Sequence, residues 1–217
     1  MKPLRILWML ITMMSLIPLN SWSKAEPQEE DRESFDVEES DKDSAKFFFH
    51  EHLAKADALV LTQMAKTEES ARRKGRKSVG QWKKDRFVFE LENEAPIAVM
   101  KHEFDGHLKE VIYFHPSSFG VKVLQFYQVP VGSQLVLQYG IDDQGVGLDP
   151  SASAYLTIWV GEHRLDRIQV PHEKGLRTKK LDLSLLPFLK RPVAVTFEVT
   201  SDNAKASRLS FLAHIQS

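Results

Sequence analysis

Residues 135–170 read LVLQYGIDDQGVGLDPSASAYLTIWVGEHRLDRIQV, and both ends of this stretch alternate between apolar and other side chains. In the segment after the loop every second residue is aliphatic, and these residues are Leu156, Ile158 and Val160. Tyr155 and Trp159 occupy the alternate positions and therefore point to the opposite face of an extended strand. Glycines, aspartates and serines fill the loop, and Gly161–Glu162 predicts a tight turn into the next strand. The stretch predicts neighbouring antiparallel strands with one aliphatic face.

The same pattern of short alternating segments runs from residue 87 to residue 217. Asp105–Gly106 is a strong hairpin signal, and Pro130 and Pro171 end their segments. Because no convincing helix interrupts these segments, the spacing predicts an all-β domain, an antiparallel β-sandwich of about 8–10 strands.

The chain begins with features of a secretory signal peptide at residues 1–25. Lys2 and Arg5 precede an apolar run over residues 6–19, and small residues lie near residue 25. We therefore expect an exported protein, periplasmic or extracellular, that is not integral to the membrane after cleavage. An uncleaved anchor is the alternative. The chain has no cysteine, which excludes disulfides and cysteine-based metal sites.

Residues 26–44 form an acidic run with ten acidic and two basic side chains. A run of this composition has little to bury and repels itself, so we expect a disordered linker. A calcium-collecting or partner-binding tail is the alternative.

Residues 45–70 carry apolar side chains three and four positions apart: Phe49, Leu53, Ala56, Val60 and Met64. This spacing predicts an N-terminal amphipathic helix, whose apolar face must be buried. The helix is expected to pack on the β-domain or to bind a protein partner, including a second copy. A membrane-surface helix is disfavoured because basic residues do not line its polar face.

Residues 71–86 hold eight basic side chains and one acidic one. They form a candidate anion-binding segment for acidic polysaccharide or lipid headgroups, and its first five members are Arg72, Arg73, Lys74, Arg76 and Lys77. Export argues against nucleic acid as a partner, and a solvated linker is the alternative. The expected organisation is a signal peptide (1–25), an acidic linker (26–44), a helix with a basic segment (45–86) and a β-sandwich (87–217).

Four elements give the chain a resemblance to galactose-binding-like jelly-roll domains, which include carbohydrate-binding modules. They are the GIDD loop at Gly140–Asp143, the strand Leu156–Gly161, the strand end Asp182–Ser184 and the alternating strands from Val193 onward. The match is best in the second half of the domain. The resemblance implies a jelly roll and a role in binding sugar or protein.

Sugar binding needs aromatic rings beside hydrogen-bonding groups, because sugar rings have apolar C–H faces and polar edges. Tyr155 and Trp159 are the main candidates, followed by Tyr139, Tyr113 and Tyr127. The alternative is that the amphipathic helix covers Tyr155 and Trp159.

Two groups of residues are candidate metal ligands. Asp142, Asp143 and Asp149 share one loop and offer oxygen ligands for a structural calcium ion, although aspartates are also ordinary turn residues. The segment from His102 to His107 contains a His–Glu pair, but its histidines are five positions apart and a turn separates them. We therefore interpret these histidines as surface residues of a hairpin.

No nucleophile motif or phosphate-binding loop is present, so we expect no catalytic residues. The carboxylates that a fold could pair for acid–base chemistry are Glu90, Glu92, Glu103, Glu162 and Asp166. The first functional hypothesis is a secreted non-catalytic module for carbohydrate or a cell-envelope component. The second is a structural or interaction protein acting through its N-terminal helix and basic segment, and the third is a small hydrolase.

Overall fold

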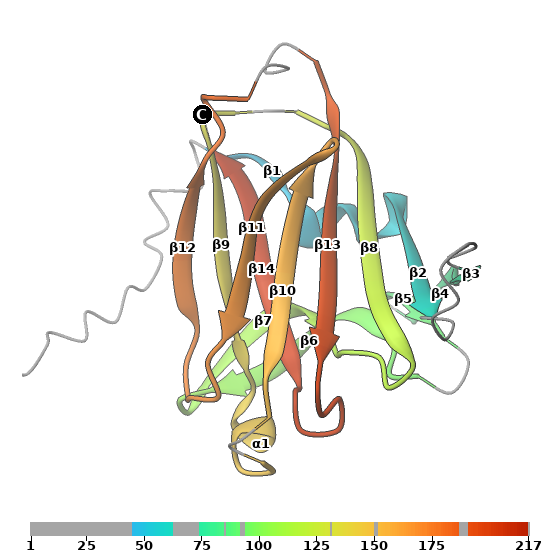
Figure 1. The fold of residues 1–217 in the computed structure, drawn as a ribbon, viewed down its shortest axis with the longest axis vertical. Coiled ribbons are helices and arrows are strands. Elements are labelled where there is room, and N and C mark those ends of the chain that lie inside the picture. The colour runs from blue at the N-terminus through green and yellow to red at the C-terminus, as the bar shows by residue number, and fades with distance from the viewer. Residues whose placement is uncertain are drawn as a thin grey trace, which may run out of the picture. The chain divides into compact units, whose positions relative to one another are not determined.

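Two antiparallel β-sheets face each other in the computed structural model (Figure 1), and the hydrophobic core lies between them. The structure describes residues 45–62, 74–84, 86–91, 94–130, 132–149, 152–186 and 191–216, all within a unit that spans Glu39–Ser217. The expected signal peptide and acidic linker lie outside the described residues. The predicted all-β class and the antiparallel sandwich are confirmed.

The first sheet has eight strands in the order β12-β9-β14-β7-β6-β5-β4, with β1 paired to β14. Its strands are β1 (Ala45–Phe48), β4 (Val79–Lys83), β5 (Arg86–Glu90), β6 (Ile97–Phe104), β7 (His107–Phe114), β9 (Gln134–Ile141), β12 (Arg177–Asp182) and β14 (Leu209–Gln216). The second sheet has six strands in the order β11-β10-β13-β8-β2-β3. These are β2 (Ala56–Thr62), β3 (Lys74–Lys77), β8 (Gly120–Val129), β10 (Ala154–Val160), β11 (His163–Val170) and β13 (Val193–Ser201).

The core contains the aliphatic face that the alternation predicted. Leu156, Ile158 and Val160 of β10 are at most 1% exposed. On the facing sheet, alternate residues of β9 and β14 are buried in the same core: Leu135, Leu137, Leu209, Phe211, Ala213 and Ile215. Burial of this apolar surface is the main term that stabilises the sandwich.

The amphipathic helix predicted from residue 45 is wrong over residues 45–62. These residues form β1, the short 3-10 helix η2 (Phe49–Lys55) and β2. Phe49 and Leu53 of η2 are buried, but in β2 the buried residues alternate, at Ala56, Ala58 and Val60. Ala56 and Val60 are four positions apart, which fits one face of a helix and also one face of a strand. Their spacing alone therefore predicts either element. Met64 lies outside the described residues.

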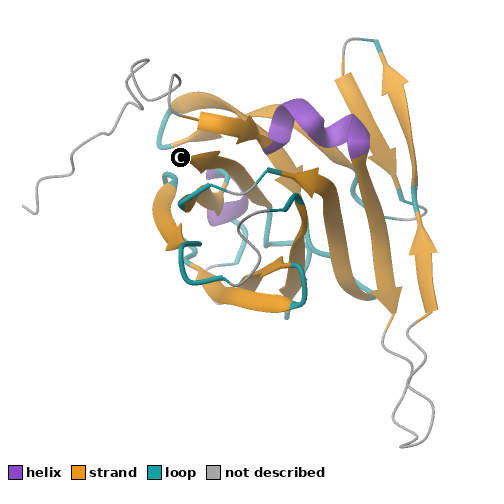
Figure 2. Ribbon diagram, turned by 90° about the horizontal axis from the view of Figure 1, so that it is seen from above, coloured by secondary structure: helices purple, strands orange, loops and turns teal. Residues whose placement is uncertain are grey.

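The described residues before position 87 therefore belong to the sandwich. β2 pairs with β8 along its whole length, from Ala56 opposite Phe126 to Thr62 opposite Gly120. The chain passes from the second sheet to the first at Ser78, between β3 and β4. The Ser78 amide donates to the Ala58 carbonyl, and its hydroxyl donates to the Glu90 carbonyl at 2.6 Å. This serine connects both sheets at one margin. Seen from above, β4 and β5 extend from the sandwich as a two-stranded arm (Figure 2).

Candidate functional site

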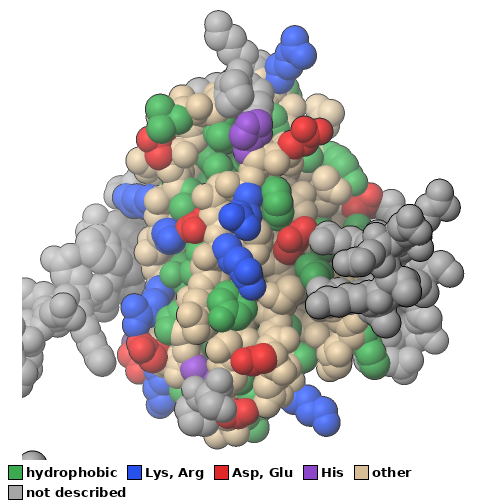
Figure 3. Space-filling model, in the orientation of Figure 1, with side chains coloured by type: hydrophobic (Ala, Val, Ile, Leu, Met, Phe, Trp, Pro, Cys, Tyr) green, Lys and Arg blue, Asp and Glu red, His purple; other side chains and the backbone are tan. Residues whose placement is uncertain are grey.

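The outer face of the six-stranded sheet carries the aromatic residues that the alternation placed opposite the core. Tyr155 and Trp159 of β10 are half-buried there. Arg164 of the neighbouring strand β11 pairs with Trp159. The guanidinium carbon of Arg167 lies 4.6 Å from the centroid of the Tyr155 ring. Basic and hydrophobic side chains lie next to each other over β10 and β11 (Figure 3). Arg167 therefore covers one face of Tyr155, which leaves this ring a poor open platform for a sugar.

The expected covering of Tyr155 and Trp159 by an N-terminal helix is not found in the described part of the chain. η2 packs against β8 and β14, and β2 is separated from β10 by β8 and β13. Trp159 keeps its indole Nε1 buried without a hydrogen-bond partner. Tyr139 is a core residue, 8% exposed, and therefore cannot stack on a ligand. Of the tyrosines proposed from the sequence, Tyr127 is the most exposed, at 47%.

A β-bulge in β8 sets the conformation of Tyr127 and its neighbour Gln128. Phe126 pairs with Val195 and Val129 with Val193, so two residues of β8 oppose one residue of β13. Gln128 takes up the extra length with a positive φ of 54°, in the left-handed region. A residue other than glycine is strained there, and such strain together with bulges is enriched at functional sites.

A cavity of about 290 Å³ opens beside this bulge. We call it the bulge pocket, and its lining residues are Phe47, His52, Lys55, Phe126, Tyr127, Gln128 and Pro130. It forms here because Ala56, the first residue of β2, pairs with Phe126, so that η2 ends next to the bulge.

The walls of the bulge pocket combine stacked rings with polar groups. The rings of Phe47 and His52 stack with centroids 4.1 Å apart. Nδ1 of His52 donates to the Phe48 carbonyl at 3.0 Å, which leaves Nε2 as an acceptor when the ring is neutral. The Tyr127 hydroxyl lies 3.0 Å from the Asp57 carboxylate and 3.0 Å from the Gln125 amide oxygen. The ring orientation is thus fixed while nearly half of the side chain faces solvent.

The three aspartates proposed as calcium ligands bind different partners. The Asp142 side chain, 2% exposed, accepts from His102 at 2.7 Å, Arg208 at 2.9 Å and the amide of Gly145 at 2.7 Å. Asp143 accepts from the amides of Asp105 and Gly106, and Asp149 accepts from Asn203. Among the described residues, no group of three histidine, aspartate or glutamate side chains is arranged to hold a metal ion.

Asp142 belongs to a buried polar network that the sequence did not predict. Burial would raise the pKa of Asp142, but hydrogen bonds from His102 and Gly145 and the charge of Arg208 hold it below its ordinary value. The His102 ring stacks on Tyr113, with centroids 4.8 Å apart, and Tyr113 stacks on His115. Our interpretation of His102 as a surface residue is wrong, because it is only 9% exposed. This network fixes the loop after β9, including the short helix α1 (Asp143–Val146).

Two further titratable groups, His115 and Lys122, have altered environments beside this network. Burial, followed by the charges of Lys122 and Arg208, lowers the pKa of His115 to about 4. Burial lowers the pKa of Lys122 to about 8, against the opposing effect of the Glu94 carboxylate. The ammonium of Lys122 donates to the Ala95 carbonyl at 2.9 Å. None of these groups lines the bulge pocket, so we assign them to folding stability.

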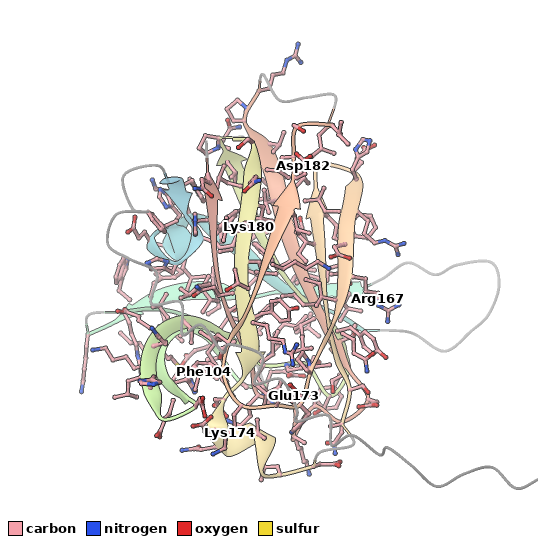
Figure 4. All side chains as sticks on the ribbon, turned by 90° about the vertical axis from the view of Figure 1, so that its left-hand side faces the viewer. Phe104, Arg167, Glu173, Lys174, Lys180 and Asp182 are labelled. Carbon is pink, nitrogen blue, oxygen red and sulfur yellow. The ribbon has the colours of Figure 1, made fainter. Side chains whose placement is uncertain are left out.

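Of the carboxylates considered for catalysis, Glu92 lies outside the described residues, and two of the others form ion pairs. Glu90 pairs with Lys83, and Asp166 of β11 binds Lys179 of β12 at 2.6 Å. The latter pair connects the edge strands of the two sheets on the side shown in Figure 4, where Arg167 is labelled on β11 and Lys180 on β12. Glu90 and Asp166 thus each bind a lysine.

The proposed anion-binding residues fall partly within β3. Arg72 and Arg73 lie outside the described residues, whereas Lys74, Arg76 and Lys77 belong to this edge strand of the six-stranded sheet. β4 follows directly and is the last strand in the order of the other sheet. The basic segment is therefore collected at one margin of the sandwich.

Sequence reasoning named Tyr127 but missed the other walls of the bulge pocket. His52 and Lys55 were assigned to a helix, and they do lie in the short helix η2, but the position of η2 beside β8 follows from the pairing of β2 with β8. Gln128 gave no signal at all, because glutamine has no preference for the left-handed region. The bulge itself depends on pairing with β13, some 65 residues further along the chain.

Comparison with known proteins gives distant structural likenesses. A carbohydrate-binding module of family 51 from Clostridium perfringens, solved with methyl-galactose, has a TM-score of 0.40 and 10% identity over 54% of this chain and 79% of its own. A structure of the M60 catalytic domain with two such modules from Clostridium perfringens ZmpB has a TM-score of 0.40 and 14% identity over 55% of this chain and 12% of its own. A cyclase from Fischerella has a TM-score of 0.31 and 12% identity over 59% of this chain and 79% of its own. Likeness at this level does not identify a ligand.

No protein-family model and no curated protein matches the sequence. Within the part of the chain that the structure describes, no helix is long and apolar enough to cross a membrane.

Proposed function

We propose that the protein is an exported, non-catalytic binding module that takes carbohydrate in the bulge pocket. The observation that carries the proposal is the exposed Tyr127 ring beside a pocket with polar groups at its rim. A sugar presents apolar C–H faces to aromatic rings and hydroxyls to amides and imidazoles. Tyr127 and His52 would take the faces, and the buried Phe47 ring would support His52 by stacking on it. Gln128 and Lys55 would take the hydroxyls.

The strained bulge supports this assignment. Holding a glutamine at a positive φ costs roughly 1 kcal/mol relative to glycine, which adopts that conformation freely. Because of this backbone conformation, Gln128 does not follow the regular side-to-side alternation of β8, and its side chain lines the bulge pocket. The size of the cavity, about 290 Å³, suits one or two sugar units rather than a larger ligand.

The test is a glycan array with the purified protein, followed by calorimetric titration of any glycan that binds. We expect Tyr127→Ala to lower the affinity about tenfold or more, because a stacked aromatic ring is removed. Gln128→Gly is expected to weaken binding while leaving the free energy of unfolding equal or higher, since glycine relieves the backbone strain. Loss of binding together with retained stability separates a ligand contact from a folding defect.

Phe119→Ala is the matched control, because Phe119 is a 61% exposed aromatic residue just before the other end of β8. It should bind like the unchanged protein. Absence of binding to every glycan would overturn the proposed function. If Trp159→Ala abolishes binding and Tyr127→Ala does not, the sugar lies on the open face over β10 and the pocket assignment is wrong.

A further inference from the structure

The β4–β5 arm has a feature that carbohydrate binding in the bulge pocket does not use. Trp82 of β4 is 67% exposed, although it lies in a stripe of rings that continues into the core. The Trp82 and Phe87 ring centroids are 5.5 Å apart, and those of Phe87 and Phe89 are 5.1 Å apart. Phe89 is only 3% exposed, so the stripe begins in the core and ends on an uncovered indole near the tip.

The arm is built to hold this stripe rigidly. A Cβ atom at Gly80 would lie 2.2 Å from the Phe87 ring, so only glycine lets Phe87 pack directly over the backbone of β4. Trp82 pairs with Phe87 and Lys83 with Arg86, and Lys84 forms the turn with a positive φ of 56°. The indole is therefore presented by an ordered hairpin that extends from the sandwich (Figure 2).

Three cations lie near the tip: Lys83 and Arg86 form the pair next to Trp82 and Phe87, on the opposite face of the hairpin, and Lys84 lies in the turn. Lys83, Lys84 and Arg86 are exposed, and Lys83 pairs with Glu90. Lys84 and Arg86 form no ion pair with the described residues. β3, which precedes the arm, adds the basic sequence Lys74–Lys77 at the same margin. Among the described residues, the tip therefore carries a large exposed apolar side chain and two cations in addition to the Lys83–Glu90 pair.

We propose that the tip of the β4–β5 arm docks on an anionic lipid surface, with the Trp82 indole at the headgroup level and the cations of the tip at the lipid phosphates. Tryptophan prefers the interface between water and hydrocarbon, and lysine and arginine near such a surface add attraction to anionic lipid. An acidic polysaccharide is disfavoured here because the polar groups that would bind its hydroxyls are engaged. The Gln81 amide donates to the Glu90 carboxylate at 2.5 Å, and Glu90 also holds Lys83.

Flotation with vesicles tests the proposal. The purified protein should float with vesicles of equal parts phosphatidylglycerol and phosphatidylcholine, and less with phosphatidylcholine alone. We expect Trp82→Ala to weaken binding to the anionic vesicles about tenfold or more. Neutralising Lys84 or Arg86 to glutamine should weaken it about fivefold each, and added salt should weaken it further. Brominated lipid should quench a part of the tryptophan emission that Trp82→Phe removes.

Leu108→Ala is the matched control, because Leu108 is a 71% exposed apolar residue on a different hairpin. It should leave vesicle binding unchanged. Any vesicle binding by the N-terminal segment is the same in every variant and therefore does not affect the comparison. Since Trp82 is largely exposed, its variants should keep the unfolding midpoint of the unchanged protein. Equal vesicle binding by Trp82→Ala and the unchanged protein overturns the proposal. Binding to soluble heparin that depends on Lys84 and Arg86, without any dependence of vesicle binding on Trp82, assigns the arm to acidic polysaccharide instead.

Discussion

His115 occupies the last position in a stack of three rings that starts at His102 and passes through Tyr113. Its Nδ1 is buried without a hydrogen-bond partner, and the Lys122 and Arg208 charges disfavour a further proton. The folded protein therefore holds His115 neutral, with a pKa of about 4, whereas the ring in an unfolded chain titrates near 6.5.

This difference makes folding stability depend on pH. Between pH 6.5 and about 4 the unfolded chain binds a proton that folded His115 refuses, so stability is fully present above pH 6.5 and is lost as the pH falls toward 4. The loss is at most about 3 kcal/mol. We expect His115→Phe, which keeps a ring on Tyr113, to remove this part of the acid sensitivity. Urea unfolding at a series of pH values measures it, and an unchanged slope in the variant would contradict the assignment.

Single residues also show how much of the candidate site could be predicted from the sequence. The alternation placed Tyr155 and Trp159 on the outer face of the right strand, because a period of two is a local property. It did not show that Arg167 stacks on Tyr155, since that contact depends on the register of β11. Tyr139 was proposed as a ligand residue, yet its side chain shares the core face with Leu135 and Leu137. Aromatic type alone does not distinguish a core tyrosine from a binding tyrosine.

At the scale of elements, the segment from β1 to β2 shows why the strands from residue 87 onward were predictable and those before it were not. In β10 and through the middle of β13 every second residue is a buried apolar side chain, and only a period of two fits. In residues 45–62, alanines and phenylalanines fit both periods, and the choice is made by pairing with β8 and β14. Contacts distant in sequence decided between helix and strand.

Phe49 of η2 provides a test of how strongly this segment belongs to the core. Its ring makes edge contacts with Phe126 and Phe197, at centroid distances of 4.9 and 5.2 Å, and it is fully buried. We expect Phe49→Ala to lower the free energy of unfolding by about 3–5 kcal/mol, because it removes a large side chain and leaves a cavity. Denaturant unfolding measures the change.

Phe48→Ala is the control for this prediction, because Phe48 is only half-buried. Its ring packs beside His214, with the ring centroids 5.3 Å apart. The cost expected there is about 1 kcal/mol. Similar small costs at both positions would mean that η2 rests on the sandwich without completing its core.

For the whole molecule, the order of strands determines how the sandwich is completed. The six-stranded sheet ends with β8-β2-β3, and the crossover at Ser78 takes the chain into β4 at the margin of the other sheet. Residues 45–86 thus supply strands to both sheets. The expected division at residue 87, with a separate helix before it, followed from assigning a helix where pairing makes strands.

Removal of residues 1–86 is therefore expected to prevent folding, although the remaining chain begins at the first strand that alternation identified. Without β2, the edge of β8 and the apolar residues under it are exposed, and the rings of Phe126 and Phe197 lose Phe49. Such an open, apolar edge favours association with other chains. A chain that begins at Glu39, where the compact unit begins, keeps every described strand and should unfold in one cooperative transition. Circular dichroism and size-exclusion chromatography distinguish these outcomes. A soluble monomer of residues 87–217 with a cooperative transition would show that the first four strands, β1 to β4, are an addition to a sandwich that is stable without them.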